Sequence, residues 1–479
     1  MKAQDLLMPC SRREMLRRMG AGFGTLGLTG MCAESSLLGS SAQAATVGAS
    51  PSDAQAPHFT PTAKHVIQLF MPGGPSHVDT FDYKPDIKRY AGQRPKLVDR
   101  ITLSNTAEGL VPSYFPFQQH GQCGKWVSSI FPHVAGVVDD ICFIHSMHTD
   151  IPEHAGAILM MNLGHLQPTR PSLGSWLVYG LGTMNENLPG FVAISPRDPP
   201  RGKAANWGNA FLPGAYAGCY VQTGRMHPDN ILANLKSQFL PRAAQREQAD
   251  LLAQLNQLHL NRQQHDADLE ASIQAMELAF RMQFAVPEAF DLSRETKATH
   301  DLYGDGEYGQ ACLLARRLVQ RGVRTVQVST SNIDHAEGIG WDSGHKDITK
   351  HAGLATVCDQ AIAALLIDLK QRGMLDETLV IWGGEFGRAP TSEKQTGRDH
   401  NHYGFTVWMA GGGVKGGISY GATDCFGCTA VENRVHVHDL HATILHLMGL
   451  NHERLTYRYS GRDFRLTDVH GKVIKEIIA

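Results

Sequence analysis

The sequence predicts an α/β fold in which a central, mostly parallel β-sheet lies between helices. Short runs of β-branched and apolar residues alternate with longer stretches of helical periodicity, as in sheets of this class. Acidic residues and histidines follow several of the apolar runs, and the loops after parallel strands meet at one edge of a sheet. The expected strands are residues 65–71, 140–147, 191–195, 324–330, 378–382 and 405–410. The expected helices are residues 155–164, 310–321, 351–372 and 438–450.

The first 44 residues have the pattern of a twin-arginine export signal and are not expected to belong to the fold. Arg12 and Arg13 precede a modestly apolar, glycine-rich stretch, and residues 42–44 (AQA) supply a small-residue cleavage site. A basic amphipathic helix is the alternative. The signal predicts a periplasmic or secreted protein that is exported by the twin-arginine pathway. Residues 45–63 are small, polar and contain proline, and are expected to form a linker.

Charge and hydropathy argue against two classes of partner. The formal net charge of −2 gives no case for binding nucleic acid. No apolar run of about 18 residues follows the leader, so no transmembrane span is expected. Cys425 and Cys428 form a single CxxC pair. A zinc site would need a second pair, so a disulfide or two free thiols is expected there.

One long stretch differs in character from the alternating pattern around it. In residues 229–286, leucine, alanine, glutamine and charged residues recur at helical spacing. This pattern predicts two long helices, inserted as an antiparallel hairpin that packs against the main domain or over its mouth.

Two early loops carry candidate functional residues. The first expected strand is followed by residues 72–82 (PGGPSHVDTFD), in which Asp79 is a candidate metal ligand or a helix cap. The second is followed by Thr149, just ahead of an expected helix. A hydroxyl there can act as a nucleophile or bind an oxyanion, because backbone N–H groups at a helix start stabilise negative charge. The alternative is that Thr149 caps the helix.

Two late loops carry the densest clusters of charged residues. Asp342 and His345 lie three residues apart in a glycine-containing stretch, which is plausible spacing for metal ligands. The strand at residues 378–382 ends in Gly383-Gly384, where the backbone can turn sharply. Directly after this turn come Glu385, Arg388, Arg398, Asp399, His400 and His402.

Together these clusters resemble the sulfatase-like secreted family known as domain of unknown function 1501, which is placed in the alkaline phosphatase and sulfatase superfamily. The resemblance spans the mature chain in order. The residues that carry it are 73–82 (GGPSHVDTFD), 148–150 (HTD) with His154, 170–176 (RPSLGSW), 340–342 (GWD), 384–388 (GEFGR) and 397–400 (GRDH). It implies that residues 64–479 form one alkaline phosphatase-like α/β domain.

The resemblance also implies roles for single residues. Asp79, Asp342, His345, Glu385 and His400 resemble metal ligands of the superfamily. The stretch from Thr149 to His154 resembles the nucleophile segment of nucleotide pyrophosphatases, with one extra residue. Phe386 stands where a ligand of a second metal would lie, so one main ion is expected. No Cys or Ser lies in the C/S-x-P-x-R context of the sulfatase formylglycine.

The function expected from this pattern is hydrolysis of phosphate or sulfate esters with a divalent metal ion: calcium, magnesium, manganese or zinc. Thr149 and His154 would act in catalysis, and Arg388 or Arg398 would hold the oxygens of an anionic ester. The substrate class includes sulfated or phosphorylated glycans. The alternatives are a degenerate protein of the same fold that binds anionic glycans or a partner protein, and a structural protein whose acids form ion pairs.

Overall fold

The computed structural model describes residues 55–98, 109–225, 285–330, 340–392 and 396–479, with isolated positions between 244 and 282. The predicted export signal and nearly all of the predicted helical hairpin lie outside the described residues. Residues 55–63, the second half of the expected linker, are hydrogen-bonded to the domain. For example, the N–H groups of Thr62 and Ala63 both donate to the carbonyl of Leu447, each over 2.9 Å.

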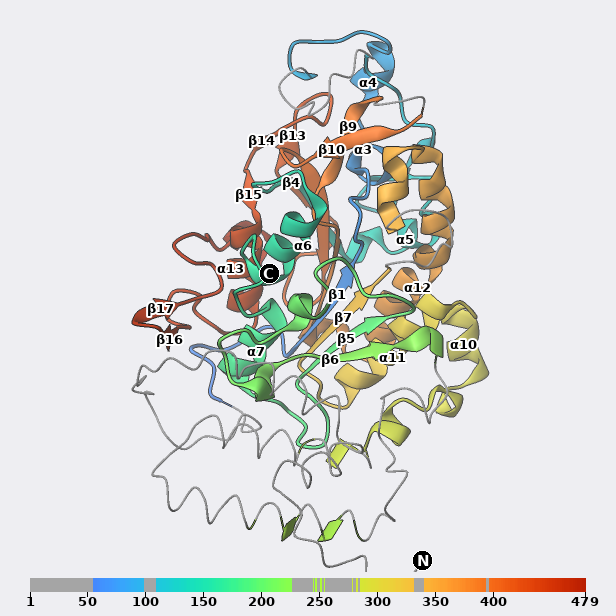
Figure 1. The fold of residues 1–479 in the computed structure, drawn as a ribbon. Helices are drawn as coiled ribbons and strands as arrows, with labels where there is room; N and C mark the ends of the chain where they lie inside the picture. Colours follow the sequence, from blue (N-terminus) through green and yellow to red (C-terminus); the bar gives the residue numbers. More distant parts are fainter. Residues whose placement is uncertain are drawn as a thin grey trace, which may run out of the picture.

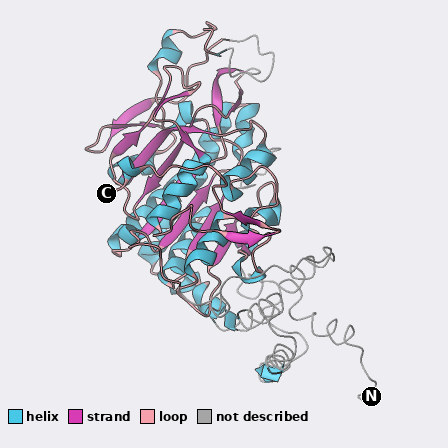
Figure 2. Ribbon diagram, turned by 90° about the vertical axis from the view of Figure 1, so that its left-hand side faces the viewer, coloured by secondary structure: helices cyan, strands magenta, loops and turns pink. Residues whose placement is uncertain are grey.

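The core of the fold is a mixed sheet with strand order β12-β4-β11-β8-β1-β7-β5-β6, and β15 also pairs with β4 (Figures 1 and 2). Its main strands are β1 His65–Phe70, β4 Ile141–His148, β5 Phe191–Ser195, β6 Cys219–Gln222, β7 Thr325–Ser329, β8 Thr378–Gly383 and β11 Phe405–Ala410. The short strands at its edge are β12 Ile418–Tyr420 and β15 Val435–His436. The predicted α/β class with a central, mostly parallel sheet is therefore confirmed.

One strand runs against the others. β11 pairs antiparallel with both β8 and β4, and every other pairing in this sheet is parallel. As a result β4 and β8 point in the same direction although β11 separates them. The amino end of β11 therefore lies at the same edge as the carboxyl ends of β4 and β8.

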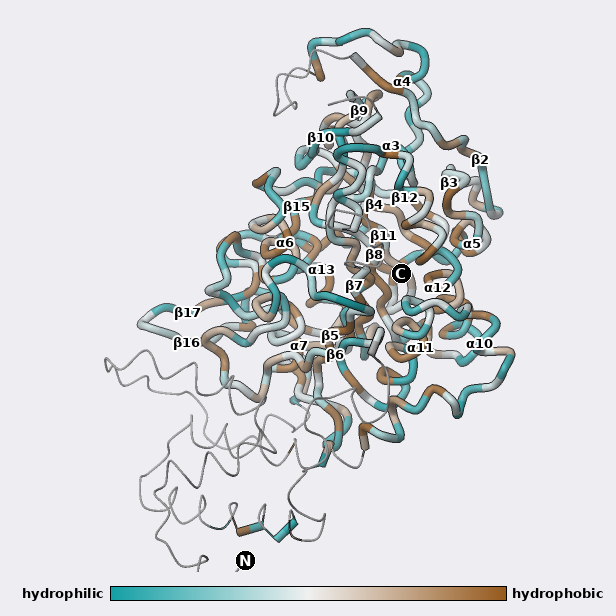
Figure 3. Tube along the Cα trace, turned by 45° about the vertical axis from the view of Figure 1, so that its right-hand side comes forward, coloured by the Kyte–Doolittle hydropathy of each residue, from teal (hydrophilic) through white to brown (hydrophobic). Residues whose placement is uncertain are grey.

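Helices cover both faces of the sheet (Figure 1). One face packs against α6 His154–Leu163, α7 Leu173–Leu181 and α13 Val437–Leu447. The other packs against α5 Pro132–Ala135, α11 Glu307–Gln320 and α12 His351–Gln371, with α10 Lys297–Tyr303 beside them. β1 has apolar side chains on both faces. Val66 and Phe70 pack in the layer of α6, α7 and α13, and Ile67 and Leu69 pack in the layer of α5, α11 and α12. Figure 3 shows this apolar centre along β7 and β8.

The remaining elements are short and lie outside the central sheet. They are α3 His77–Thr80, α4 Pro85–Arg89 and the strand pairs β2 Phe117–His120 with β3 Lys125–Ser128, β9 Gly387–Ser392 with β10 Arg398–Asn401, β13 Ala422–Thr423 with β14 Ala430–Glu432, and β16 Tyr457–Tyr459 with β17 Arg462–Phe464. The β9–β10 pair and α3 lie together beyond the upper end of the sheet in Figure 1.

One helix of the described part of the chain, residues 348–371, is long and apolar enough to cross a membrane. This is weak evidence for a span, because 67% of its apolar window is buried within the fold, and core helices pass the same test. Within the fold, this segment includes α12 and packs against α11 and α5.

The seven described cysteines are all free thiols, including Cys425 and Cys428. Of the two alternatives for the CxxC pair, the structure has two free thiols. Cys425 is exposed and Cys428 is buried.

Candidate metal centre

Four loops that are far apart in the sequence meet at one edge of the sheet. β1 and β8 are parallel neighbours that end in register, with Phe70 opposite Gly383. On the other side of β8, the start of β11 at Phe405 pairs with Met147, near the end of β4. β7 also ends in register with β1, with Ser329 opposite Phe70. The segments after β1, β4 and β7, and the segment that connects β8 to β11, therefore emerge together.

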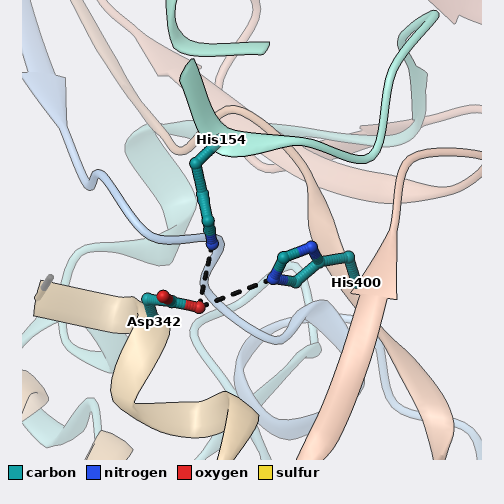
Figure 4. Close-up of side chains that lie close together, drawn as sticks. All are labelled: His154, Asp342 and His400. Atoms are coloured by element: carbon teal, nitrogen blue, oxygen red, sulfur yellow. Dashed lines mark ion pairs between the residues drawn. The ribbon is translucent and has the colours of Figure 1, made fainter. Parts of the chain in front are cut away.

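Three side chains from these loops converge at this edge: His154 at the start of α6, Asp342 in the 3₁₀ turn Gly340–His345, and His400 in β10 (Figure 4). One ligand atom from each lies within 4.8 Å of the other two. The Oδ1 atom of Asp342 lies 2.8 Å from Nε2 of His154 and 3.5 Å from Nε2 of His400. His154 is 4% exposed, whereas Asp342 and His400 are partly open to solvent.

The other ring nitrogen of each histidine is already committed to a partner. Nδ1 of His154 lies 2.6 Å from Oε1 of Glu385, and Nδ1 of His400 lies 2.7 Å from the carbonyl of Pro152. A carbonyl only accepts, so Nδ1 of His400 must be the protonated nitrogen, and the same role at Nδ1 of His154 suits the Glu385 carboxylate. Both Nε2 atoms then face Asp342. Histidine ligands of metals are commonly oriented by partners of this kind on the second nitrogen.

The geometry of the three residues fits a small divalent ion. Ligand atoms about 2.0 Å from a tetrahedral zinc lie about 3.3 Å from one another. The His400–Asp342 separation of 3.5 Å already has this size. The His154–Asp342 separation of 2.8 Å is that of a hydrogen bond. A shift of about half an ångström between these two side chains would bring their separation to the value around zinc.

Glu385 is fully buried and lies behind His154. Both of its carboxylate oxygens accept from the N–H of Gly73, over 2.9 and 3.1 Å, and Oε1 also faces His154. The structure thus places Glu385, a predicted ligand, behind the three residues that could hold a metal, where its carboxylate contacts His154. It places His154, a predicted catalytic residue, among the three that can hold a metal.

Arg388 supports the centre from inside the protein. Its side chain is fully buried, and Nη2 lies 2.9 Å from Oδ1 of Asp342. Nε donates to the carbonyl of Gly74 over 2.9 Å, and Nη2 also donates to the carbonyl of Gly73. Arg388 therefore ties the turn after β1 to Asp342.

The charges in this group shift the pKa values of its members. Burial alone would raise the pKa of Asp342, but hydrogen bonds from His154 and His400 and the charge of Arg388 hold it well below its usual range. Burial alone would lower the pKa of His154, but hydrogen bonds to Asp342 and Glu385 raise it above its ordinary value. Burial lowers the pKa of His400, which favours the neutral ring that binds metals.

Phe386 fixes the two histidine rings. Its ring centroid lies 4.8 Å from that of His154 and 4.7 Å from that of His400. Gly74 lies against the same ring: its φ is +73°, and a Cβ there would come within 2.8 Å of the Phe386 ring. The aromatic residue that replaces an expected ligand therefore has a packing role at the centre.

Asp79 and Arg398 are paired with each other and are not part of the three-residue group. Nε of Arg398 lies 2.7 Å from Oδ2 of Asp79, and Nη2 lies 3.2 Å from Oδ1. Ser76 donates its hydroxyl to Oδ2 over 2.5 Å. Burial would raise the pKa of Asp79, but the charge of Arg398 together with the hydrogen bonds to the carboxylate lowers the pKa below its ordinary value. The pair links α3 to β10, and both side chains are buried.

Thr149 lies against the segment between β10 and β11, and His345 lies beside His400. The N–H of Thr149 donates to the carbonyl of His402 over 2.9 Å, and its buried Oγ1 has no hydrogen-bond partner among the described residues. It does not cap α6, because Glu153 does so by accepting from the N–H groups of Ala155 and Gly156. The ring centroid of His345 lies 4.9 Å from that of His400.

Sequence patterns did not indicate two supports of the centre. The carbonyl of Pro152 is a backbone group, and the Gly73 N–H that holds Glu385 has no side-chain signal. The sequence also could not single out His154, Asp342 and His400 among its many acids and histidines. Which of these side chains contact one another depends on the fold.

The chain belongs to the family described as protein of unknown function (DUF1501), which residues 63–478 match. No curated protein matches it.

Solved structures of low similarity include Ps i-CgsB in complex with k-i-k-neocarrahexaose (9% identity, 81% of this chain and 72% of that chain covered, TM-score 0.36). PsFucS1 sulfatase from Pseudoalteromonas sp. is 14% identical, with 82% and 68% covered and a TM-score of 0.36. TAB5 alkaline phosphatase is 11% identical, with 82% and 99% covered and a TM-score of 0.32. Similarity at this level carries no information about the substrate.

Proposed function

We propose that the protein is an exported, metal-dependent hydrolase of phosphate or sulfate esters. The observation that carries the proposal is the arrangement of His154, Asp342 and His400. Two Nε2 atoms and one carboxylate oxygen face one point, while the opposite nitrogens are held by Glu385 and Pro152. These three residues would hold one divalent ion.

The donor set narrows the choice of metal. Two imidazoles and one carboxylate suit zinc or manganese better than calcium, which takes six to eight oxygen ligands. Three protein ligands leave a position for water or substrate, as in catalytic zinc sites. When bound, the ion would polarise an ester oxygen and lower the pKa of an attacking hydroxyl.

The chain's own residues would position and activate the reactants. Thr149 is the proposed nucleophile, because its hydroxyl lies after β4, ahead of α6, and has no competing hydrogen bond among the described residues. Arg388 is paired with Asp342 and Arg398 with Asp79, so the two arginines would stabilise the site and would not bind the oxygens of the ester. The metal would then be the main positive charge that contacts the substrate. A single ion favours compact anionic esters, including those on glycans.

The first test separates the chemistry of Thr149 from its packing. Replacing a buried hydroxyl that has no partner by a methyl group of the same shape should leave stability unchanged or slightly higher. Thr149→Val should therefore keep or raise the melting temperature while abolishing ester hydrolysis, and Thr149→Ser should retain activity. Full activity of Thr149→Val would remove Thr149 from the mechanism.

The second test separates a hydrolase from a binding protein of the same fold. The buried, paired arginines bear on this choice, because they leave the described site without a free guanidinium to stabilise the charge of a reacting ester. The purified mature protein would be analysed for metal, loaded with zinc or manganese, and assayed on phosphate and sulfate mono- and diesters. Metal binding without turnover of any ester would favour binding of anionic glycans or a partner protein.

A further inference from the structure

A second polar cavity, of about 210 Å³, shares no residue with the metal centre. It lies between the β2–β3 pair, the segment that follows α3, and the β4–β12 edge of the sheet. Drug-sized ligands occupy pockets of roughly 300 Å³ or more, so this cavity has the size for one small ring.

Two exposed aromatic rings form one wall. Tyr83 is 38% exposed and Trp126 is 40% exposed, and their ring centroids lie 4.5 Å apart with 34° between the planes. Phe117 supports Tyr83 at a centroid distance of 5.1 Å. Large aromatic residues that stay exposed together beside a cavity commonly mark a binding surface. Their faces suit the flat, C–H-rich face of a sugar ring, and the Tyr hydroxyl and Trp N–H can bond its hydroxyls.

One cation faces this cavity without a carboxylate partner. Nζ of Lys125 donates to the hydroxyl of Ser419 over 3.0 Å, and the structure records no ion pair for it within the described residues. An ammonium group has three donors, so two remain for a ligand. Lys125 can therefore bind a carboxylate or sulfate group placed beside the aromatic wall.

Two further polar groups lie deeper in the cavity. Asp82 is 5% exposed and is held by Nζ of Lys84 over 3.0 Å and by the hydroxyl of Thr423 over 2.5 Å. Nδ1 of His145 lies 3.2 Å from the hydroxyl of Thr406, and the ring stacks on Phe143. Burial lowers the pKa of His145 to about 4, so the ring is neutral at neutral pH, and Nε2 is the nitrogen that Thr406 leaves for a ligand. Neutral imidazole and a fixed carboxylate are suited to sugar hydroxyls.

These features together define one ligand chemistry: an apolar ring face, several hydroxyls and a single negative group. An aliphatic ligand would not use the two remaining donors of Lys125, and an inorganic anion would not use the aromatic wall. We propose that this cavity binds one ring of an acidic sugar, with the ring against Trp126 and Tyr83 and the acid group on Lys125. The proposal does not depend on hydrolysis at the metal centre.

The test measures binding of single sugars to the mature protein by calorimetry and saturation-transfer NMR. The acidic probes are galacturonic acid, glucuronic acid and galactose 6-sulfate, and the neutral reference is galactose. Wild type should bind at least one acidic probe more tightly than galactose. Trp126→Ala should weaken that binding by about tenfold or more, as expected for an aromatic anchor. Lys125→Gln should reduce the affinity for the acidic probe to that for galactose.

Three controls keep the outcome decisive. Lys472→Gln removes an exposed positive charge elsewhere and should bind like wild type. Asp342→Asn alters the metal centre and should also bind like wild type, so a failure of the proposed hydrolase is distinguishable from a failure of this site. Trp126→Phe keeps an aromatic face and should retain part of the affinity. Circular dichroism of Trp126→Ala shows whether its loss of binding occurs in a folded protein. Absence of binding of every acidic probe, or unchanged binding by Trp126→Ala and Lys125→Gln, would overturn the proposal.

Discussion

The chemistry of the metal centre depends on which nitrogen of each histidine carries the proton. Glu385 and Pro152 accept at Nδ1 of His154 and His400, which leaves both Nε2 atoms for a ligand. Glu385→Gln keeps the side-chain shape and an acceptor for Gly73, but it removes the charge that orients His154. Loss of such a supporting partner typically weakens metal affinity by about tenfold to a hundredfold.

We therefore expect Glu385→Gln to weaken zinc or manganese binding by that factor, measured by calorimetry or competition with a chelating dye. Glu377→Gln is the matched control, because Glu377 is exposed and pairs with Lys64 away from the centre. Equal affinity of Glu385→Gln and wild type would show that Glu385 only packs against His154.

The raised pKa of His154 predicts opposite effects of pH on stability and on metal binding. In the metal-free protein the folded state binds the His154 proton more tightly than the unfolded state, whose pKa is about 6.5. This contribution to stability is fully present below pH of about 6.5 and is lost as the pH rises through the higher folded value. Metal binding must displace the same proton and should strengthen over that interval.

The measurement is the difference in unfolding free energy between wild type and His154→Gln, by urea denaturation with chelator at several pH values. The difference cancels other histidines, such as His351 and His438, whose pKa values burial lowers to about 3. The stabilisation of wild type over His154→Gln should shrink from pH 6 toward pH 9. A difference that is constant or grows with pH would contradict the raised pKa.

At the scale of elements, the Asp79–Arg398 pair predicts that Asp79 joins α3 to β10 and does not bind metal. Arg398→Met leaves a buried carboxylate without its partner, which typically costs about 3–5 kcal/mol of stability. Asp79→Asn should destabilise the protein while metal affinity stays unchanged. The double variant should be more stable than Arg398→Met, because no unpaired charge remains. Loss of metal binding in a folded Asp79→Asn protein would restore Asp79 as a ligand.

The helices and strands also show which parts of the fold could be predicted from the sequence. Apolar runs predicted six of the seven main strands of the sheet, because buried strands are continuous apolar runs. The seventh, β6, was not predicted. They did not predict the direction of β11, which follows only from its pairing. Thus His400, expected among residues after a strand, reaches the edge because it precedes a reversed strand. α7 was missed, because Gly174 and Gly180 lower its helical signal within a loop-like stretch.

The site could be predicted only in part for a similar reason. Asp342 and His400 were expected ligands and do lie together, and Glu385 lies one contact away. Asp79 was indistinguishable from them in sequence, because an acid after a strand can bind a metal or an arginine equally well. Asp79 forms an ion pair with the buried Arg398, because α3 packs against the β9–β10 pair that carries this arginine.

For the whole molecule, the leader predicts where the protein functions. Changing both Arg12 and Arg13 to Lys should hold the precursor in the cytoplasm, because the paired arginines are the recognition feature of the predicted pathway. Cell fractionation and immunoblotting would measure the distribution of precursor and mature protein. A matched control changes Arg17 and Arg18, which lie outside the pair, and should be exported. Normal export of the Arg12/Arg13 variant would contradict the predicted twin-arginine signal.

Metal binding should stabilise the whole fold, because the centre joins the loops of four strands. An ion that binds only the folded state adds about 2.7 kcal/mol at a hundredfold excess over its dissociation constant. If Asp79, Asp342 and Glu385 had no partners, they would repel one another without metal, and Asp342→Asn would not lower the metal-free melting temperature. The structure gives the opposite expectation, since each carboxylate has its own partners: Arg398, Arg388 with His154, and Gly73 with His154.

Asp342→Asn should therefore melt below wild type in chelator, because the buried Arg388 loses its charged partner. It should also lose most of the rise in melting temperature that zinc or manganese gives to wild type. Calorimetric melting of both proteins, with chelator and with each metal, measures the two effects independently. Asp301→Asn is the matched control, because Asp301 pairs with Lys297 on an exposed helix surface, and it should match wild type in both conditions. A wild-type melting temperature that neither metal nor chelator changes would refute the metal centre.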